Sequence, residues 1–355
     1  MKLKKLSSSS YNAGIDFLRI FAMLMIIITH ILGKGGIRDE VQGDIDIYYW
    51  VTWLIQVTAY GAVNCYALIS GYVGLRSPYR YSKGLSLWVQ VFFYTLGLTL
   101  IFAAAGQKLS AADWLGAFFP VITGQYWYIT AYFGLLVFMP LLNMSLLKLS
   151  DKDLRHLVFV AVFFFSVMPA LFNTKVDEFS FAKGFSMNWL IVLYIIGAYL
   201  SRLDLKKLFK TRRLILAYTL SILVTFTMKF LIGDIWYWYT SPSLLAGSVA
   251  LFILCANLEI KDNSRFFSFI RRFAPTTLGV YLFHLNPLMV RFWMRDVFIS
   301  FVDAPIVLFP LLILGTAVLI FAISALVELF RLKLFRFLRI QKLTDRLDRV
   351  FPFGQ

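Results

Sequence analysis

Long apolar runs recur along this chain from near its first residue to near its last, and they limit the folds open to it. A transmembrane helix needs about 20 consecutive, mostly apolar residues, and seven runs reach that length. The composition agrees, because 60% of the residues are hydrophobic and only 15% are charged, whereas about a quarter are charged in soluble domains. The sequence therefore predicts an all-α, polytopic membrane protein with about ten transmembrane helices.

The predicted spans comprise the seven long runs and three shorter ones. Each of the shorter runs would reach spanning length if it included flanking polar residues that face other helices. A further apolar stretch, 114–121, is too short to span and is expected to lie at the outer surface or to dip into the membrane. The long runs are 13–32, 48–69, 85–105, 126–147, 214–232, 274–294 and 306–330, and the shorter ones are 157–172, 187–200 and 244–258.

The net charge of +16 is spread unevenly over the loops. If the N-terminus is cytoplasmic, every cytoplasmic loop is rich in Lys and Arg, while the first outer loop carries Asp39, Glu40, Asp44 and Asp46. This asymmetry is the positive-inside pattern, so both termini are predicted to be cytoplasmic and the protein to lie in the cytoplasmic (plasma) membrane. Orientation and contact with anionic lipid explain the positive charge, and no nucleic acid partner is expected.

The chain is expected to form one membrane domain with two short tails. Residues 1–12 are a basic, Ser-rich cytoplasmic tail, 13–330 the membrane domain, and 331–355 a basic amphipathic tail on the inner membrane surface. Cys65 and Cys255 fall in apolar runs, which predicts buried thiols and no metal site. Motifs of the GxxxxGK, HExxH, CxxC and GxSxG types do not occur.

The first predicted span carries side chains that are costly in a bilayer. Arg19 and His30 are eleven residues apart, which places them on one helix face, about 16 Å apart along the axis. Asp16, three residues before Arg19, can pair with it. One interpretation is a structural ion pair near the inner surface, with His30 as a packing residue. The other is a polar cavity along this face, and two such residues on one face favour it.

Other polar side chains are candidates with two interpretations each. His284, near the middle of the ninth span, is either a hydrogen-bonding group between helices or a catalytic or substrate-contacting residue. His156 follows a basic loop and is expected to be solvated. The loop that holds Arg76, Arg80 and Lys83 has two explanations. Its positive charge is sufficient as a topology signal, but it could also be a phosphate site, because arginines bind phosphate oxygens in two-point geometry.

Several segments resemble the acyltransferase-3 membrane family. IDFLRIFAMLMIIITH is similar to its first-helix signature, in which an Arg is followed after ten residues by a His. NCYALISGY resembles a second motif that ends in Ser-Gly-Tyr or Ser-Gly-Phe, and the loop from Arg76 to Lys83 lies where the family carries cytoplasmic arginines. GQYWYITAYFGLLVFMPLLN and GVYLFHLNP resemble two later segments. The matches follow family order and cover most of the chain.

This resemblance implies an O-acyltransferase. Such an enzyme transfers an acyl group, often acetyl, from cytoplasmic acetyl-CoA to a hydroxyl group of a polysaccharide or lipid-linked glycan of the cell envelope. Acetyl-CoA is then a co-substrate, and lipid and glycan are the expected partners. The family's Arg and His correspond to Arg19 and His30.

A mechanism consistent with the spacing follows as a hypothesis. Coenzyme A would place its phosphates on Arg19, Arg76, Arg80 and Lys83 and thread its pantetheine arm along the first helix toward His30. His30 would act as general base on the attacking hydroxyl group. Arg19, His30 and the ninth-span histidine are the catalytic candidates.

The sequence identifies the residues around the acceptor less clearly than those around coenzyme A. Tyr281, Trp127 and His284 are all candidates for stabilising the oxyanion. Ser70, Trp127 and Tyr281 are the expected substrate contacts. The aromatic segment 236–238 could bind a sugar face, although aromatic residues are also common at membrane interfaces.

A transporter or flippase is the main alternative, because intramembrane Arg, Asp and His also suit a proton-coupled path. Carriers often show inverted repeats and broken helices in matching halves. Neither is visible in the sequence. A membrane scaffold without chemistry would leave the cost of Arg19 and His30 unexplained.

Overall fold

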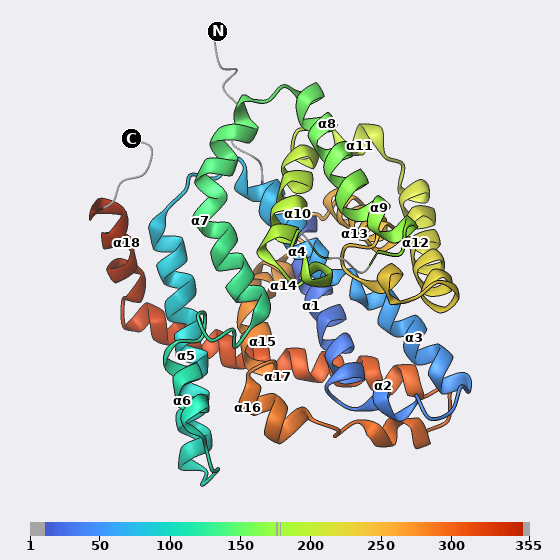
Figure 1. Ribbon diagram of the computed structural model, residues 1–355. Helices are drawn as coiled ribbons and strands as arrows, with labels where there is room; N and C mark the ends of the chain where they lie inside the picture. The colour runs from blue at the N-terminus through green and yellow to red at the C-terminus, as the bar shows by residue number, and fades with distance from the viewer. Residues whose placement is uncertain (1–10, 175–176, 178, 351–355) are drawn as a thin grey trace.

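The computed structural model describes residues 11–174, 177 and 179–350, and these residues form helices and connecting loops without any β-strand (Figure 1). The predicted all-α class is therefore confirmed. The predicted tail 1–12 lies almost wholly outside the described residues. The principal helices are α1 (Ala13–Gly33), α2 (Ile37–Glu40), α3 (Ile47–Tyr60), α4 (Ala62–Gly74), α5 (Tyr81–Ala104), α6 (Ala111–Phe118), α7 (Trp127–Lys148), α8 (Asp151–Val162), α9 (Met168–Leu171), α10 (Met187–Leu200), α11 (Leu205–Leu208), α12 (Thr211–Leu231), α13 (Pro242–Ala256), α14 (Arg265–Phe273), α15 (Thr277–His284), α16 (Pro287–Met289), α17 (Phe309–Phe337) and α18 (Ile340–Val350).

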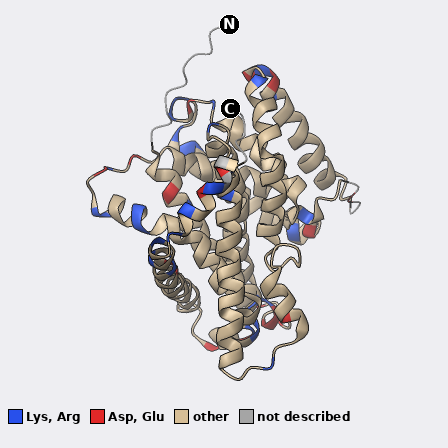
Figure 2. Ribbon diagram, turned by 90° about the vertical axis from the view of Figure 1, so that its left-hand side faces the viewer, with Lys and Arg blue, Asp and Glu red and all other residues tan. Residues whose placement is uncertain are grey.

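Within the described residues, seven helical segments are long and apolar enough to cross a membrane. Each coincides with a predicted span, and α10 adds a shorter apolar helix. Figure 2 shows long stretches of helix without charged residues, while Lys, Arg, Asp and Glu gather in a few places. The chain is thus a multi-pass membrane protein, and the count of about ten spans stays a prediction. The seven segments are Ala13–Gly33, Tyr81–Ala104, Trp127–Lys148, Asp151–Leu171, Thr211–Leu231, Asp234–Ala256 and Phe309–Phe337.

Two of the predicted spans are broken helices, which the apolar runs did not reveal. The run 48–69 divides into α3 and α4 at Gly61, where the chain passes close to Ser248 of α13. The run 274–294 ends its regular helix at His284 and resumes at Pro287. Proline has no N–H to continue a helix, and the Asn286 side chain caps the new start by accepting from the Leu288 N–H at 3.0 Å.

The bundle has two ends, which we name by their features. The basic-loop end holds the loop between α4 and α5, and the α2 end is opposite, where α1 leads into α2 (Figure 1). The start of α1 and the final helix α18 both lie at the basic-loop end. The Asn12 side chain donates to the Ala256 carbonyl at 2.9 Å, and Ser82 at the start of α5 donates its N–H to Asp348 of α18 at 2.8 Å. These two hydrogen bonds attach the first and last described helices to neighbouring parts of the bundle.

The boundary predicted at residue 330 lies inside α17, which continues to Phe337. Arg331, expected on the surface tail, is instead buried and paired with Glu328 at 2.6 Å. The Glu328 carboxylate also accepts from the Tyr94 hydroxyl at 2.7 Å and from the Gln90 amide at 3.1 Å. These partners satisfy a carboxylate that would otherwise be costly to bury, and they fasten α17 to α5.

Close approach of α4 and α10 depends on glycine. A Cβ atom on Gly71 would overlap the backbone carbonyl of Tyr194. We expect Gly71→Ala to destabilise the protein by about 1–3 kcal/mol, because the two helices must separate. Thermal unfolding in detergent measures this. Gly97→Ala is the matched control, since its Cβ would meet no atom within 4 Å. Equal melting temperatures for the two variants would contradict the prediction.

Candidate functional site

A cavity of about 1310 Å³ follows the α1 face that carries Arg19 and His30. Both residues line it, as their shared helix face predicted. At the basic-loop end it is lined by Arg80 and Lys83, and at the α2 end by Lys34 and further charged residues. A single cavity therefore reaches both ends of the bundle. Of the predicted site residues, Arg19, Ser70, Arg80, Lys83, Trp127, Tyr281 and His30 line it, and Arg76 and His284 do not.

At the basic-loop end, Arg19 is held in place but remains accessible. Its guanidinium pairs with Asp16, as predicted, and 33% of the Arg19 side chain is exposed. The Tyr66 hydroxyl donates to the Arg19 backbone carbonyl at 2.6 Å and so ties α4 to α1. Lys83 donates to the Ser77 hydroxyl at 2.8 Å and to the Pro78 carbonyl at 3.3 Å. These contacts leave cationic groups facing the cavity.

Arg76 does not join this group. Its guanidinium donates to the Ser201 carbonyl at 3.0 Å, beyond the end of α10. The side chain therefore fastens the basic loop to a neighbouring helix, and the expectation that it lines the same site as Arg80 is corrected. His156 is exposed on α8, as the sequence indicated.

His30 and His284 are in contact, although 254 positions separate them in the sequence. His30 Nδ1 lies 3.1 Å from His284 Nε2, and His284 Nδ1 lies 2.6 Å from the Val280 carbonyl oxygen. A carbonyl oxygen only accepts, so His284 Nδ1 must carry a proton and donate it. In a neutral His284 the Nε2 atom then accepts from His30 Nδ1, which leaves His30 Nε2 unprotonated. His284 thus lies behind His30 and orients it.

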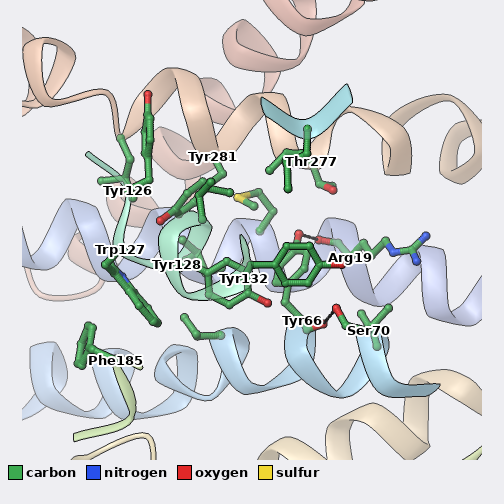
Figure 3. A pocket seen from close by; sticks show the side chains of 18 of the residues that line it. Arg19, Tyr66, Ser70, Tyr126, Trp127, Tyr128, Tyr132, Phe185, Thr277 and Tyr281 are labelled. Carbon is green, nitrogen blue, oxygen red and sulfur yellow. Dashed lines mark hydrogen bonds between the residues drawn. The ribbon is translucent and has the colours of Figure 1, made fainter. Parts of the chain in front are cut away.

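A row of aromatic side chains lines the middle of the cavity (Figure 3). In that view Arg19 and Ser70 lie at one end, Trp127 and Phe185 lie at the other, and tyrosines fill the space between. The Ser70 hydroxyl donates to the Tyr66 carbonyl of its own helix at 3.0 Å. The predicted Trp127 packs against Phe185, with ring centroids 4.7 Å apart. The predicted contacts Ser70 and Trp127 therefore share one cavity, at opposite ends of the aromatic row.

Tyr281 differs from its aromatic neighbours in its hydroxyl group. The Tyr281 Oη atom is buried and no described residue accepts its proton, although the Tyr128 backbone N–H lies close enough to donate to it. By contrast, the Tyr126 hydroxyl donates to the Leu282 carbonyl at 2.7 Å and accepts from Asn286 at 3.2 Å. A buried donor without an acceptor is rare and costly, which suits a hydroxyl that donates to a substrate atom.

Sequence analysis missed several of the lining residues. Tyr128 and Tyr132 were not singled out, although they follow Trp127 and lie four residues apart on one face of α7. That spacing was a usable signal. The cations at the α2 end were not singled out either. Among the described residues, no group of three His, Cys, Asp or Glu side chains is placed to hold a metal ion.

Comparison with known proteins gives one finding for the chain as a whole. A family model described as an acyltransferase domain matches residues 12–327. The match includes α1, both histidines, the basic loop and every helix that lines the cavity. No curated protein and no solved structure matches the chain.

Proposed function

Because this chain belongs to the acyltransferase-3 family and is a membrane acyltransferase, we propose that it transfers an acetyl group from acetyl-CoA to a hydroxyl group of a cell-surface or lipid-linked glycan. The observation that carries the proposal is the cavity that reaches both ends of the bundle and contains His30. Acetyl-CoA would enter at the basic-loop end, which the charge pattern predicts to be cytoplasmic. The acceptor would enter from the α2 end. The two substrates would meet beside His30.

His30 acts as the general base in this mechanism. Its Nε2 atom takes the proton from the acceptor hydroxyl group as the hydroxyl oxygen attacks the thioester carbonyl carbon. The new C–O bond forms, the C–S bond breaks, and the coenzyme A sulfur leaves and takes the proton from His30. His284 is a positioning residue here, because its Nε2 faces His30 and is not directed at the substrate. This role replaces the oxyanion contact that was one of its sequence-based options.

Tyr281 is the oxyanion donor that the contacts support best. Its residue lines the cavity, and its buried hydroxyl has no acceptor among the described residues. It lies three residues before His284 on α15, so both side chains point to the same side of that helix. A preorganised donor in a site shielded from water stabilises the negative charge that develops on the carbonyl oxygen.

The phosphates of coenzyme A are assigned to Arg19, Arg80 and Lys83. Guanidinium and ammonium groups bind phosphate through charge-assisted hydrogen bonds. The pantetheine arm would lie against α1, where Met23 and Ile26 also line the cavity, over the interval of about 16 Å between Arg19 and His30.

We expect the double substitution Arg80→Ala with Lys83→Ala to raise the KM for acetyl-CoA by about tenfold or more, since each lost charged hydrogen bond weakens phosphate binding. Steady-state kinetics with varied acetyl-CoA measure it. Arg76→Ala is the matched control, because it removes a loop arginine that does not line the cavity. An equal rise in KM for the control would contradict the assignment.

A carrier remains the second candidate, and the broken helices α3–α4 and α15–α16 favour it. The two functions separate in detergent, where no compartments exist. Purified protein with radiolabelled acetyl-CoA should show His30-dependent transfer or hydrolysis of the label. If folded protein binds neither acetyl-CoA nor longer acyl-CoAs, the proposed acetyl transfer is wrong and the carrier becomes the better account.

A further inference from the structure

The α2 end of the cavity carries a cluster of cations that the acetyl transfer itself does not use. Lys34, Arg38, Arg291 and Arg295 line it there, together with the carboxylates Asp39 and Asp296. Resting on the proposed function, we propose that the glycan acceptor is anionic. It carries a phosphate or carboxylate group on the acetylated sugar or on the sugar next to it.

The position of Lys34 sets the distance between the two groups of the acceptor. Lys34 follows His30 by four residues and directly caps α1, with its N–H bonded to the His30 carbonyl at 2.7 Å. This offset places it about 6 Å beyond His30 along the helix axis. A hydroxyl group at His30 and an anionic group at Lys34 therefore lie within one or two sugar units of each other.

The segments that carry these cations are held together by backbone contacts. Asp296 donates its N–H to the Lys34 carbonyl at 3.2 Å, and Phe298 donates to the Gly35 carbonyl at 3.0 Å. Gly36 adopts φ of 91° at this junction, and a Cβ atom there would lie 2.9 Å from Asp296 Oδ1. Arg295 thus projects from a fixed backbone beside Lys34, which makes the pair suitable for a defined ligand.

Three of the four cations lack strong partners. Arg291 is engaged, because its guanidinium donates to both carboxylate oxygens of Asp113 at 2.8 and 3.0 Å. That hydrogen bond is the main cause that lowers the pKa of Asp113 to about 2, so the pair persists at neutral pH. Arg38 approaches its neighbour Asp39 only at 4.0 Å. Lys34 and Arg295 form no ion pair among the described residues.

Aromatic rings lie between this cluster and the cavity, where the apolar part of a sugar would be placed. The Arg38 guanidinium lies 6.0 Å from the Trp53 ring centre, and Trp53 meets Tyr237 edge to face at 5.6 Å. Tyr60 stacks between Tyr237 and Tyr239, with centroid distances of 4.1 and 4.4 Å. Tyr60 and Tyr239 line the cavity. Because Tyr60 is covered on both faces, these rings offer a sugar an apolar wall formed by their edges, beside the cations that contact its anionic group.

The first test identifies the product in cells. Acetylated surface and lipid-linked glycans are compared between cells that express the protein and cells that express His30→Ala. We expect a His30-dependent product whose acetylated sugar, or its direct neighbour, bears a phosphate or carboxylate group. A neutral glycan product would overturn the anionic acceptor and leave the acetyl transfer intact. The lack of any His30-dependent product would overturn the acetyl transfer itself.

The second test uses that acceptor with the purified protein. Lys34→Gln combined with Arg295→Gln should raise the KM for the acceptor by about tenfold or more while the KM for acetyl-CoA stays unchanged. Lys108→Gln, an exposed lysine that does not line the cavity, is the matched control and should change neither. If the KM for acetyl-CoA rises instead, the cluster binds coenzyme A phosphates and the proposal is wrong.

Discussion

Replacing His30 with Ala is expected to lower kcat for acetyl transfer by about 10²–10⁴-fold, the range that a positioned general base contributes. The KM for acetyl-CoA should change little, because the proposed phosphate contacts lie about 16 Å away at Arg19 and the basic loop. Radiolabelled acetyl-CoA and the purified protein in detergent measure both quantities. His156→Ala is the matched control. Because His156 is exposed on α8, its replacement should leave kcat and KM unchanged.

The contact between the histidines sharpens this test. His284→Ala leaves His30 Nδ1 without its acceptor, so we expect a loss of about 10- to 100-fold, smaller than that of His30→Ala. His284→Gln should recover part of the activity, because the amide oxygen can accept from His30 while the amide nitrogen donates to the Val280 carbonyl. If His284→Ala and His284→Gln behave alike, or if His30→Ala retains activity, the assigned roles are wrong.

The sequence predicted the parts of the site that depend on local helical geometry. Arg19 and His30 share a face because eleven residues complete nearly whole turns, and the structure confirms that both line one cavity. Asp16 pairs with Arg19 because three residues bring side chains together on a helix. The apolar runs likewise identified the long helices, since length and hydrophobicity are properties of a single segment.

What the sequence could not show is how distant segments meet. The sequences around His30 and His284 do not indicate that the two side chains meet, because their contact follows from the packing of α15 against α1. The break at Asn286-Pro287 was hidden inside a continuous apolar run, since hydropathy ignores which backbone donors are present. Arg331 was placed in a surface tail, yet it is buried because it pairs with Glu328, whose carboxylate also accepts hydrogen bonds from α5.

Tyr281→Phe gives the second large effect that we expect, and it tests the oxyanion donor with a change of one oxygen atom. Loss of such a donor lowers kcat by about 10²–10³-fold, because the developing negative charge loses a preorganised hydrogen bond. The KM for acetyl-CoA should stay within a few fold, as the ring is retained. The measurement is a single-turnover rate with labelled acetyl-CoA.

Stability separates this catalytic role from a structural one. The buried Tyr281 hydroxyl donates to no described residue, so its removal should change the melting temperature little. Tyr126→Phe is the matched control from the same aromatic row. It should lower stability by about 1–3 kcal/mol, because the Tyr126 hydroxyl bonds both Leu282 and Asn286. An active Tyr281→Phe would exclude this hydroxyl as the donor and leave Trp127 as the remaining sequence candidate, since the ring nitrogens of His284 are engaged by His30 and Val280. A variant that loses both activity and stability would instead mean that Tyr281 supports the fold of the cavity.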